Sequence, residues 1–312
     1  MSTFAEAVVL IERAGTFTEL TGGRVAEEAY RSWVKLVHPD AVGTAERATA
    51  TAIFAKLSRL YAERGATVLR TSHGTYRVGD LVATGDIADL SAVDGGWLVK
   101  VPRSPADNDL MAAEAEALQR LRDKGDPKFR PYAPKLIESF VHEGGDRKRR
   151  RVTVLERLDG FVPLSRLDRE LDWRDAAWMW RRLLTGLGWA HRAGVVHGAV
   201  VEEHVLIHPG EHGLALVDWC YSGSPVAAVV KRRRGAYPPE VLKHKTATPA
   251  TDIYMATGLM TRLVGDGLPA ALRRFADGCR YDAPRMRPQD AWRLLGELDE
   301  LLGPRKFRPF TL

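Results

Sequence analysis

A histidine, a proline and an aspartate follow one another at residues 38–40, where a segment with helical apolar spacing ends. Proline cannot continue a helix, and it disfavours helical angles in the residue before it. The helix is therefore predicted to end here, so that the imidazole of His38 and the carboxylate of Asp40 stand on a rigid turn. These groups suit recognition of a partner; alternatively, the turn is only a corner between two helices.

Positive charge is concentrated next to this turn and in two further runs. Arg24, Arg31 and Lys35 lie on the helix that leads into the turn, and denser basic runs span residues 147–151 and 231–234. Solvated loops are the simpler interpretation of both runs, and an acidic partner or nucleic acid is the alternative. Neither run interleaves aromatic residues for base stacking, so we do not expect nucleic acid as a partner.

The composition is that of an ordinary globular chain. With 312 residues, of which 45% are hydrophobic and 28% charged, the chain is long enough for two domains. No long apolar run predicts a membrane span, and the N-terminus lacks the basic start of a signal peptide. The two cysteines, Cys220 and Cys279, fit neither a metal spacing nor a disulfide framework. We therefore expect a cytoplasmic protein without a membrane partner.

The period of the apolar residues changes along the chain and predicts an α+β protein. Residues 1–66 have helical spacing and predict a small helical domain, which residues 67–74 link to the rest. Residues 75–158 are rich in β-branched and aromatic residues and predict strands around one helix. Residues 159–303 predict mostly helix, and residues 304–312 predict an irregular tail on the surface.

Shorter signals mark the ends of individual elements. Gly65 predicts the end of the last helix in the first domain, and the Asp-Gly-Gly of residues 94–96 predicts a hairpin turn. One helix is expected around residues 108–122 and another from Trp173 onward. Four tryptophans in this later stretch are expected in the core: Trp173, Trp178, Trp180 and Trp189.

Residues 24–64 resemble a J domain, the co-chaperone module of the DnaJ family. In that family a basic helix ends in a His-Pro-Asp loop, and a second, antiparallel helix follows. Four residues stand where the family packs the two helices together: Tyr30, Leu36, Phe54 and Leu57. The resemblance implies that the module docks on a DnaK-type chaperone and stimulates its ATPase. The residues that it assigns to this contact are His38, Pro39, Asp40, Arg31 and Lys35.

Residues 76–303 resemble the protein-kinase superfamily through the order of their motifs. The resemblance implies a bilobal fold, with a β-rich N-lobe up to Leu158 and a helical C-lobe after it. Lys100 in WLVKV stands where the family places the lysine that pairs with the phosphates of the nucleotide. Glu114 best matches the carboxylate partner of that lysine, and Glu116 is the second match.

Further motifs follow in the same order. VLERLDG resembles the hinge between the lobes and contains Glu156, and LVDWC resembles the metal-binding element, with Asp218 as the ligand. TDIY resembles the helix that anchors the larger lobe, here through Asp252. Arg287 is positioned to pair with Glu240 of YPPEV.

The glycine-rich loop departs from the family pattern. Its glycines should let backbone N–H groups approach phosphate closely, but the matching residues are Ala83, Gly85 and Ala88. Asp86 and Asp89 beside them would repel phosphate. At most weak binding of ATP and Mg²⁺ is therefore expected. The nucleotide-binding residues that the resemblance implies are Lys100, Glu114, Gly85 and Glu156.

The catalytic loop departs further, because HGAVVEEH stands in place of HRDxxxxN. Ala199 replaces the aspartate that accepts the proton of the substrate hydroxyl, Val201 replaces the lysine, and His204 replaces the asparagine that holds a second magnesium. A methyl group cannot accept a proton, and a positioned general base accelerates a reaction about 10²–10⁴-fold. Histidine is also a poor ligand for magnesium, which prefers oxygen. The resemblance therefore implies a pseudokinase without catalytic residues.

Two observations leave alternatives open. Glu202 and Glu203 could stand in for the lost base, although a solvated pair is the simpler interpretation. The dipeptide His197-Gly198 and the sequence Val-Asp-Trp at residues 217–219 are similar to small-molecule phosphotransferases, although His197 is better explained by a hydrogen bond to the backbone near Asp218.

Together these patterns predict a J-domain-containing pseudokinase. It would act as a co-chaperone or scaffold that recruits a DnaK-type chaperone to an unknown client or regulatory protein. The alternative is an active atypical kinase or small-molecule phosphotransferase that uses displaced acidic residues.

Overall fold

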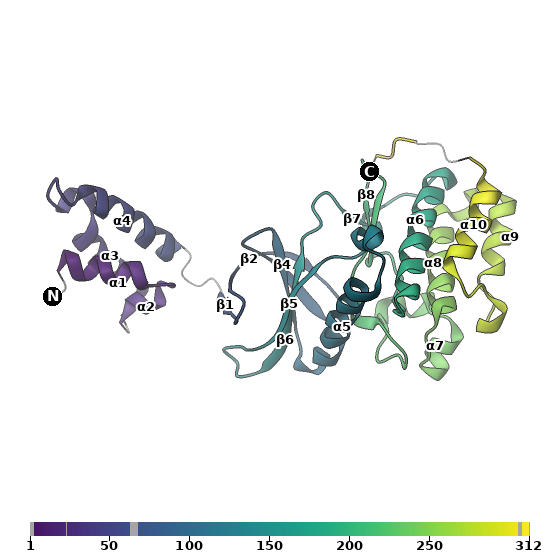
Figure 1. The fold of residues 1–312 in the computed structure, drawn as a ribbon, viewed down its shortest axis with the longest axis horizontal. Helices are drawn as coiled ribbons and strands as arrows, with labels where there is room; N and C mark the ends of the chain where they lie inside the picture. Colours follow the sequence, from purple (N-terminus) through teal and green to yellow (C-terminus); the bar gives the residue numbers. More distant parts are fainter. Residues whose placement is uncertain (1–2, 23, 63–67, 305–307, 312) are drawn as a thin grey trace. The chain divides into compact units, whose positions relative to one another are not determined.

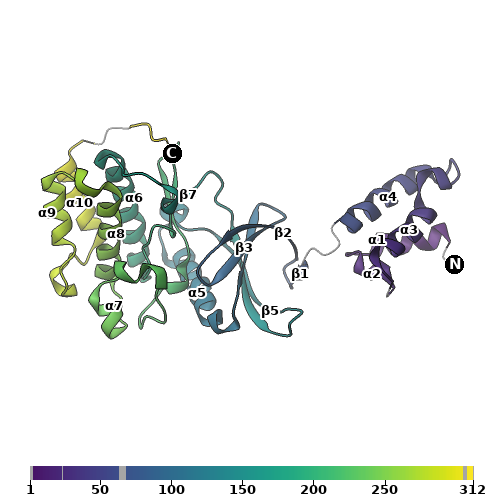
Figure 2. The same cartoon turned by 180° about the vertical axis from the view of Figure 1, so that it is seen from behind.

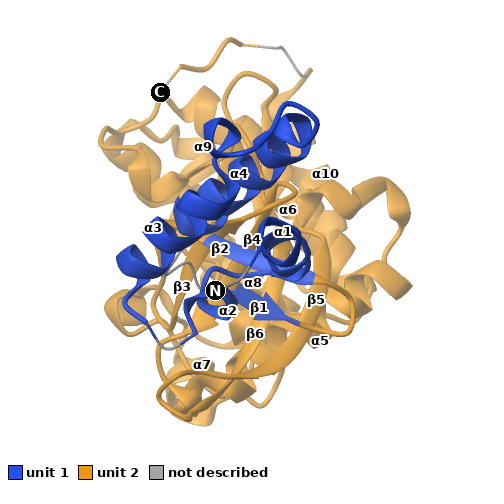
Figure 3. Cartoon of the chain, turned by 90° about the vertical axis from the view of Figure 1, so that its left-hand side faces the viewer, with its two compact units in different colours: residues 1–70, 75–78 blue, residues 71–74, 79–312 orange. Residues whose placement is uncertain are grey.

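The structure, a computed structural model, describes residues 3–22, 24–62, 68–304 and 308–311. The chain divides into two compact units (Figure 3). The first comprises residues 1–70 and 75–78, and the second comprises residues 71–74 and 79–312. Gly65, the predicted end of a helix, lies outside the described residues.

The described residues of the first unit form four α-helices, and short turns join them. A capping box at Thr3 and Glu6 starts the first helix. Pro39 begins a single 3₁₀ turn, η1, and therefore separates the third helix from the fourth. The helices are α1 (Phe4–Arg13), α2 (Thr18–Thr21), α3 (Ala26–Val37) and α4 (Arg47–Ala62).

Apolar faces of these helices form a core of their own, in which Ile11, Val37 and Leu57 are fully buried. The rings of Tyr30 and Tyr61 stack with their centroids 3.9 Å apart and so join α3 to α4. Leu57, Tyr30, Leu36 and Phe54, the residues expected to pack these helices together, all belong to this core or lie against it.

Part of the segment expected to be a linker is a strand. Residues 68–70 form β1 (Val68–Arg70), which pairs antiparallel with the start of β2 (Thr75–Thr84). The side chain of Leu69 is only 2% exposed. The division between the units falls within β2, because residues 75–78 belong to the first unit and residues 79–84 to the second.

The second unit begins with an antiparallel sheet in the strand order β2-β3-β4-β6-β5. The turn at residues 94–96 joins β3 to β4, as predicted, because Gly95 and Gly96 have the positive φ angles that this hairpin requires. Helix α5 (Asn108–Lys124) packs against β5 and β6 (Figure 1). The remaining strands are β3 (Ala88–Val93), β4 (Trp97–Pro102), β5 (Leu136–Glu143) and β6 (Arg149–Glu156).

The second half of this unit is built around α6 (Trp173–Arg192), which packs against α8 and α10 (Figures 1 and 2). Trp180 and Trp189 of α6 are buried in the core, as expected, and Trp173 and Trp178 are partly buried against it. The other helices are α7 (Pro239–His244), α8 (Pro249–Val264), α9 (Ala270–Gly278) and α10 (Ala291–Leu302).

The prediction of mostly helix after residue 159 missed a small second sheet. It has the strand order β7-β8-β9 and comprises β7 (Val162–Pro163), β8 (Val205–His208) and β9 (Gly213–Leu216). Each strand has at most four residues, too few for alternation of polar and apolar residues to be seen. The chain is nevertheless an α+β protein, as predicted.

Two tertiary contacts fix the helical half. The guanidinium of Arg287 donates two hydrogen bonds, of 2.7 and 3.0 Å, to the buried carboxylate of Glu240, which confirms the predicted pair. The tail does not lie wholly on the surface, because Phe310 is only 6% exposed and contacts the ring of Trp178. No helix within the described part of the chain is long and apolar enough to cross a membrane.

Candidate functional site

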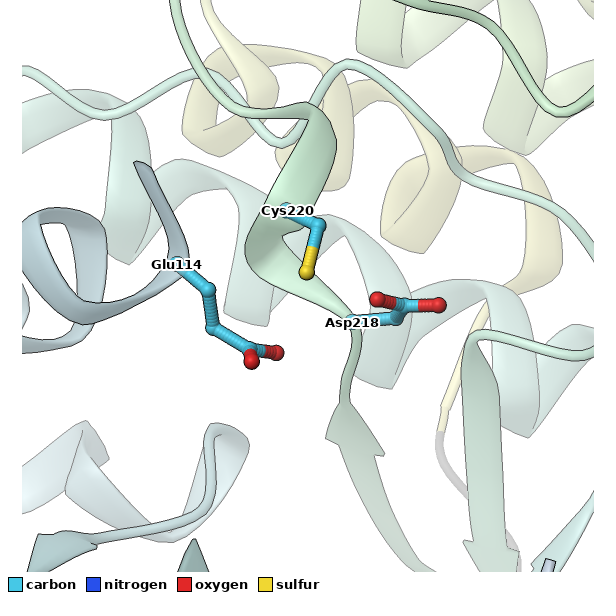
Figure 4. Close-up of side chains that lie close together, drawn as sticks. All are labelled: Glu114, Asp218 and Cys220. Atoms are coloured by element: carbon cyan, nitrogen blue, oxygen red, sulfur yellow. The ribbon is translucent and has the colours of Figure 1, made fainter. Parts of the chain in front are cut away.

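A buried ammonium group lies at the centre of the second unit. Lys100 on β4 is 3% exposed, and its Nζ donates hydrogen bonds to Glu114 Oε1 at 2.9 Å and to Asp218 Oδ1 at 2.7 Å. Its third neighbour is the Cys220 Sγ, at 3.2 Å. In Figure 4 the three partners of the ammonium converge from α5 and from the segment after β9. Glu114 is thus the partner of Lys100, whereas Glu116 is exposed.

Electrostatics keep this group charged. Burial by itself lowers the pKa of Lys100, but the negative charge of Asp218 and the neighbouring Cys220 and Glu114 outweigh it and hold that pKa well above its ordinary value. Burial also raises the pKa of the Cys220 thiol, and the charges of Lys100 and His204 hold the pKa of Asp218 well below its usual range against the effect of burial. An ion pair between Lys100 and Asp218 follows.

This arrangement does not fit a metal ion. Oxygen and sulfur atoms of Glu114, Asp218 and Cys220 lie within 4.8 Å of one another, close enough to share an ion. Nζ of Lys100 already makes hydrogen bonds to all three, so that a divalent ion at the same point would oppose a buried positive charge.

His204 occupies the other side of the Asp218 carboxylate. Its Nε2 lies 3.0 Å from Asp218 Oδ2, and its Nδ1 lies 3.0 Å from the carbonyl oxygen of Ala199. Both ring nitrogens therefore face acceptors. Lys100 and His204 each engage one oxygen of Asp218, so a magnesium ion, which the sequence resemblance implied, would have to compete with both side chains.

The loop that carries these residues is anchored on helix α8. The fully buried carboxylate of Asp252 accepts hydrogen bonds of 2.8 Å from the backbone N–H groups of His197 and Gly198. Gly198 has φ +76°, and a Cβ atom there would lie 2.4 Å from the carbonyl oxygen of Tyr221. Asp252 thus holds the loop, as expected, and only glycine fits this position.

The ring of His197 has a structural position. Its Nε2 lies 3.1 Å from the carbonyl oxygen of Val217, which confirms the predicted hydrogen bond next to Asp218. Burial lowers the pKa of His197 to about 4, although the charge of Asp252 partly opposes this effect. The ring is therefore neutral at pH 7.

Ala199 and Val201 contribute only packing. Both side chains are fully buried in the apolar core. Neither carries a group that could accept a proton or bind a phosphate, as their residue types predicted.

A cavity of about 500 Å³ lies beside Lys100, between the sheet and the helical half. The structure brings the predicted residues together around it: Gly85, Lys100, Glu114, Glu156, His204 and Asp218 all line its wall. The N–H of Gly85 is not available to a phosphate, because it donates to the carbonyl oxygen of Ala88 at 2.8 Å. The cavity can therefore admit a small molecule but lacks a phosphate-binding loop.

Two acidic residues of the cavity wall, Asp86 and Glu203, are paired with the second basic run. Arg232 lies 3.2 Å from Asp86 and 3.4 Å from Glu203, and Arg233 pairs with both Glu203 and Glu202. The run forms the 3₁₀ segment η6 (Lys231–Ala236). Lys231, Arg232 and Arg234 are exposed, as expected of a solvated segment. The ion pairs of Arg232 and Arg233 were not predicted, because their partners are distant in sequence and only folding brings them together.

The His-Pro-Asp turn of the first unit is ordered and open to solvent. His38 Nδ1 accepts a hydrogen bond of 3.2 Å from the N–H of Asp40, and the ring contacts Phe54 of α4. The side chains of His38 and Asp40 are 41% and 77% exposed. On α3, Lys35 is exposed, and Arg31 pairs with Glu27 at 2.5 Å.

No protein-family model matches the chain, and no curated protein matches its sequence significantly. The candidate sites are therefore defined by their own residues.

The lowered pKa of His197 predicts a specific loss of stability in acid. Because folding lowers the pKa of this ring, the unfolded chain takes up the proton first as the pH falls. The contribution of the neutral ring to the unfolding free energy is therefore complete above pH 6.5 and is lost as the pH falls toward 4. Between pH 7 and 5 the parent should lose about 2 kcal/mol more unfolding free energy than His197→Gln. Urea unfolding followed by tryptophan fluorescence measures this difference, since only Trp33 of the eight tryptophans lies in the first unit.

The exposed His244 provides the control, because His244→Gln should leave the pH dependence of the parent unchanged. An equal pH dependence in the parent and His197→Gln would contradict the assignment of a buried neutral ring.

Proposed function

We propose that this protein is a J-domain-containing pseudokinase that acts as a co-chaperone or scaffold. Its first unit recruits a DnaK-type chaperone through the His-Pro-Asp turn. Its second unit is a bilobal kinase-like body that binds a client or regulatory protein in the cytoplasm and does not transfer phosphate.

The chaperone half of the proposal is supported by the exposed turn at the end of α3. His38 and Asp40 are presented by a helix that cannot continue through Pro39, and their side chains remain accessible. Arg31 and Lys35 are four residues apart and so lie on the same face of α3. A partner with an acidic surface can therefore meet two cations and the turn together.

The proposal that the second unit is a pseudoenzyme is supported by the contacts of the charged residues that line the cavity. A transferred phosphoryl group needs a positioned base and a metal that neutralises developing charge. Here the base position is a buried methyl group, Ala199, and both oxygens of Asp218 are held by Lys100 and His204. A cavity without a general base and without a free metal ligand suits binding better than catalysis.

An active atypical kinase or small-molecule phosphotransferase is the second candidate. The close contact between Lys100 and Glu114 and the cavity beside it favour this reading, because they would suit a nucleotide. The acids that could replace the lost base are Glu202 and Glu203, but both form ion pairs with Arg233. This candidate therefore ranks below the pseudokinase.

The turn provides the test of chaperone recruitment. His38→Gln and Asp40→Asn should each abolish stimulation of a DnaK-type ATPase in a steady-state assay, because each removes an exposed recognition group. Neither should change the unfolding of the first unit by more than about 0.5 kcal/mol. Glu12→Gln, at an exposed position on α1, should stimulate as the parent does. The chaperone proposal fails if the parent does not stimulate, or if both turn variants stimulate normally.

Phosphate transfer is tested with radiolabelled ATP. The parent should label neither itself nor a generic protein substrate above background, since Ala199 cannot act as a base. Ala199→Asp alone should recover little, because His204 still holds Asp218 and the glycine-poor turn is unchanged. Lys100→Ala controls for contaminating kinases. Robust labelling by the parent that Lys100→Ala abolishes would instead establish the second candidate function.

A further inference from the structure

A second cavity, which we call the rear cavity, lies behind the segment that follows β6. Its volume is about 430 Å³, within the range of about 300–1,000 Å³ that is usual for small-molecule sites. Its floor is apolar, because Leu118 and Leu121 of α5, Ala133 and Trp189 are all buried. Neither Lys100 nor Asp218 lines it.

Close packing fixes this floor. The indole N–H of Trp189 donates to the carbonyl oxygen of Asp126 at 3.1 Å. A Cβ atom on Gly125 would lie 2.5 Å from the indole nitrogen, so glycine is required for the ring to sit there. The rear cavity is therefore bounded by side chains that cannot easily collapse into it.

The rim is cationic. Arg122 of α5, Arg130 of the 3₁₀ segment η3 (Pro127–Tyr132) and Lys135 are exposed and line the cavity. Arg122 pairs with Asp123, whose pKa the charge of Arg130 also helps to lower. The guanidinium of Arg130 donates to the carbonyl oxygen of Arg122 at 3.1 Å. The one acidic residue of the lining, Glu156, has an oxygen that accepts the backbone N–H of Lys135.

We propose that the rear cavity binds a small monoanion with an apolar body, such as a medium-chain carboxylate. Its chain would bury against Leu118, Leu121 and Trp189. Its carboxylate would lie at the rim, near the exposed positive charges of Arg130 and Lys135. Charge complementarity and an apolar floor together select this class over neutral ligands and over cations.

Octanoate is the probe, titrated into the full chain by isothermal calorimetry. A series from hexanoate to decanoate should tighten about fourfold for each added methylene until the cavity is filled, after which the gain stops. Octanol should bind at least tenfold more weakly than octanoate, because it lacks the charge.

Variants locate the site. Combined Arg130→Gln and Lys135→Gln should weaken octanoate binding about tenfold, because the two rim cations that face the carboxylate are lost. Both positions are exposed, and urea unfolding of the variant checks the loss of the hydrogen bond from Arg130 to the carbonyl oxygen of Arg122. Lys128→Gln removes an exposed cation of the same segment η3 that does not line the cavity, and should have no effect. Ala133→Leu fills the floor and should abolish binding, with unfolding measured alongside.

Three results would overturn the proposal. The proposal is wrong if octanoate binds the combined variant as tightly as it binds the parent. It is also wrong if octanoate does not bind the parent saturably. Val82 lines only the front cavity beside Lys100. If Val82→Glu weakens octanoate binding and the combined variant does not, the ligand occupies the front cavity and the rear assignment is wrong.

Discussion

The second unit depends on the burial of one ammonium group. A charge that is 3% exposed is costly unless partners compensate it, and Lys100 meets that constraint with groups from two other parts of the chain. Glu114 comes from α5, and Asp218 and Cys220 come from the segment after β9. The sheet, the helix and the loop must therefore hold their relative positions, because moving any of them leaves a buried charge without compensation.

The same interactions bear on the proposed absence of phosphate transfer. A phosphoryl-transfer site needs cationic groups and a metal that are free to neutralise the charge of the phosphate. Here Lys100 and His204 each engage one oxygen of Asp218, and Arg232 and Arg233 pair with Asp86 and Glu203 of the cavity wall. These charges are compensated within the chain, which is why the proposed function is binding and not catalysis.

Features encoded locally were predictable from the sequence. Pro39 determines the turn after α3, because proline cannot continue a helix. Gly95 and Gly96 favour the hairpin, because glycine readily adopts the positive φ angles that its turn requires. The resemblance to the kinase superfamily ranked Glu114 before Glu116 as the partner of Lys100, and the structure pairs Glu114 with that lysine. Three features that depend on contacts between distant residues were not predicted. They are the pairing of η6 with Glu203, the burial of Phe310, and the rear cavity, which residues from α5, β5 and α6 help to form. The contact between Cys220 and Lys100 had no sequence signal, because the two residues are far apart in the chain.

The central claim is that other side chains of the protein compensate the charges of the front cavity. Calorimetric titration of ATP with and without Mg²⁺ tests this claim most directly. The parent should bind ATP with a Kd in the millimolar range, or not at all, and Mg²⁺ should change this Kd little. A Kd of about 1 mM corresponds to a binding free energy of about 4 kcal/mol. His204→Asn releases one oxygen of Asp218 and should increase the dependence on Mg²⁺. Micromolar, magnesium-dependent binding by the parent that Asp218→Asn abolishes would contradict this account.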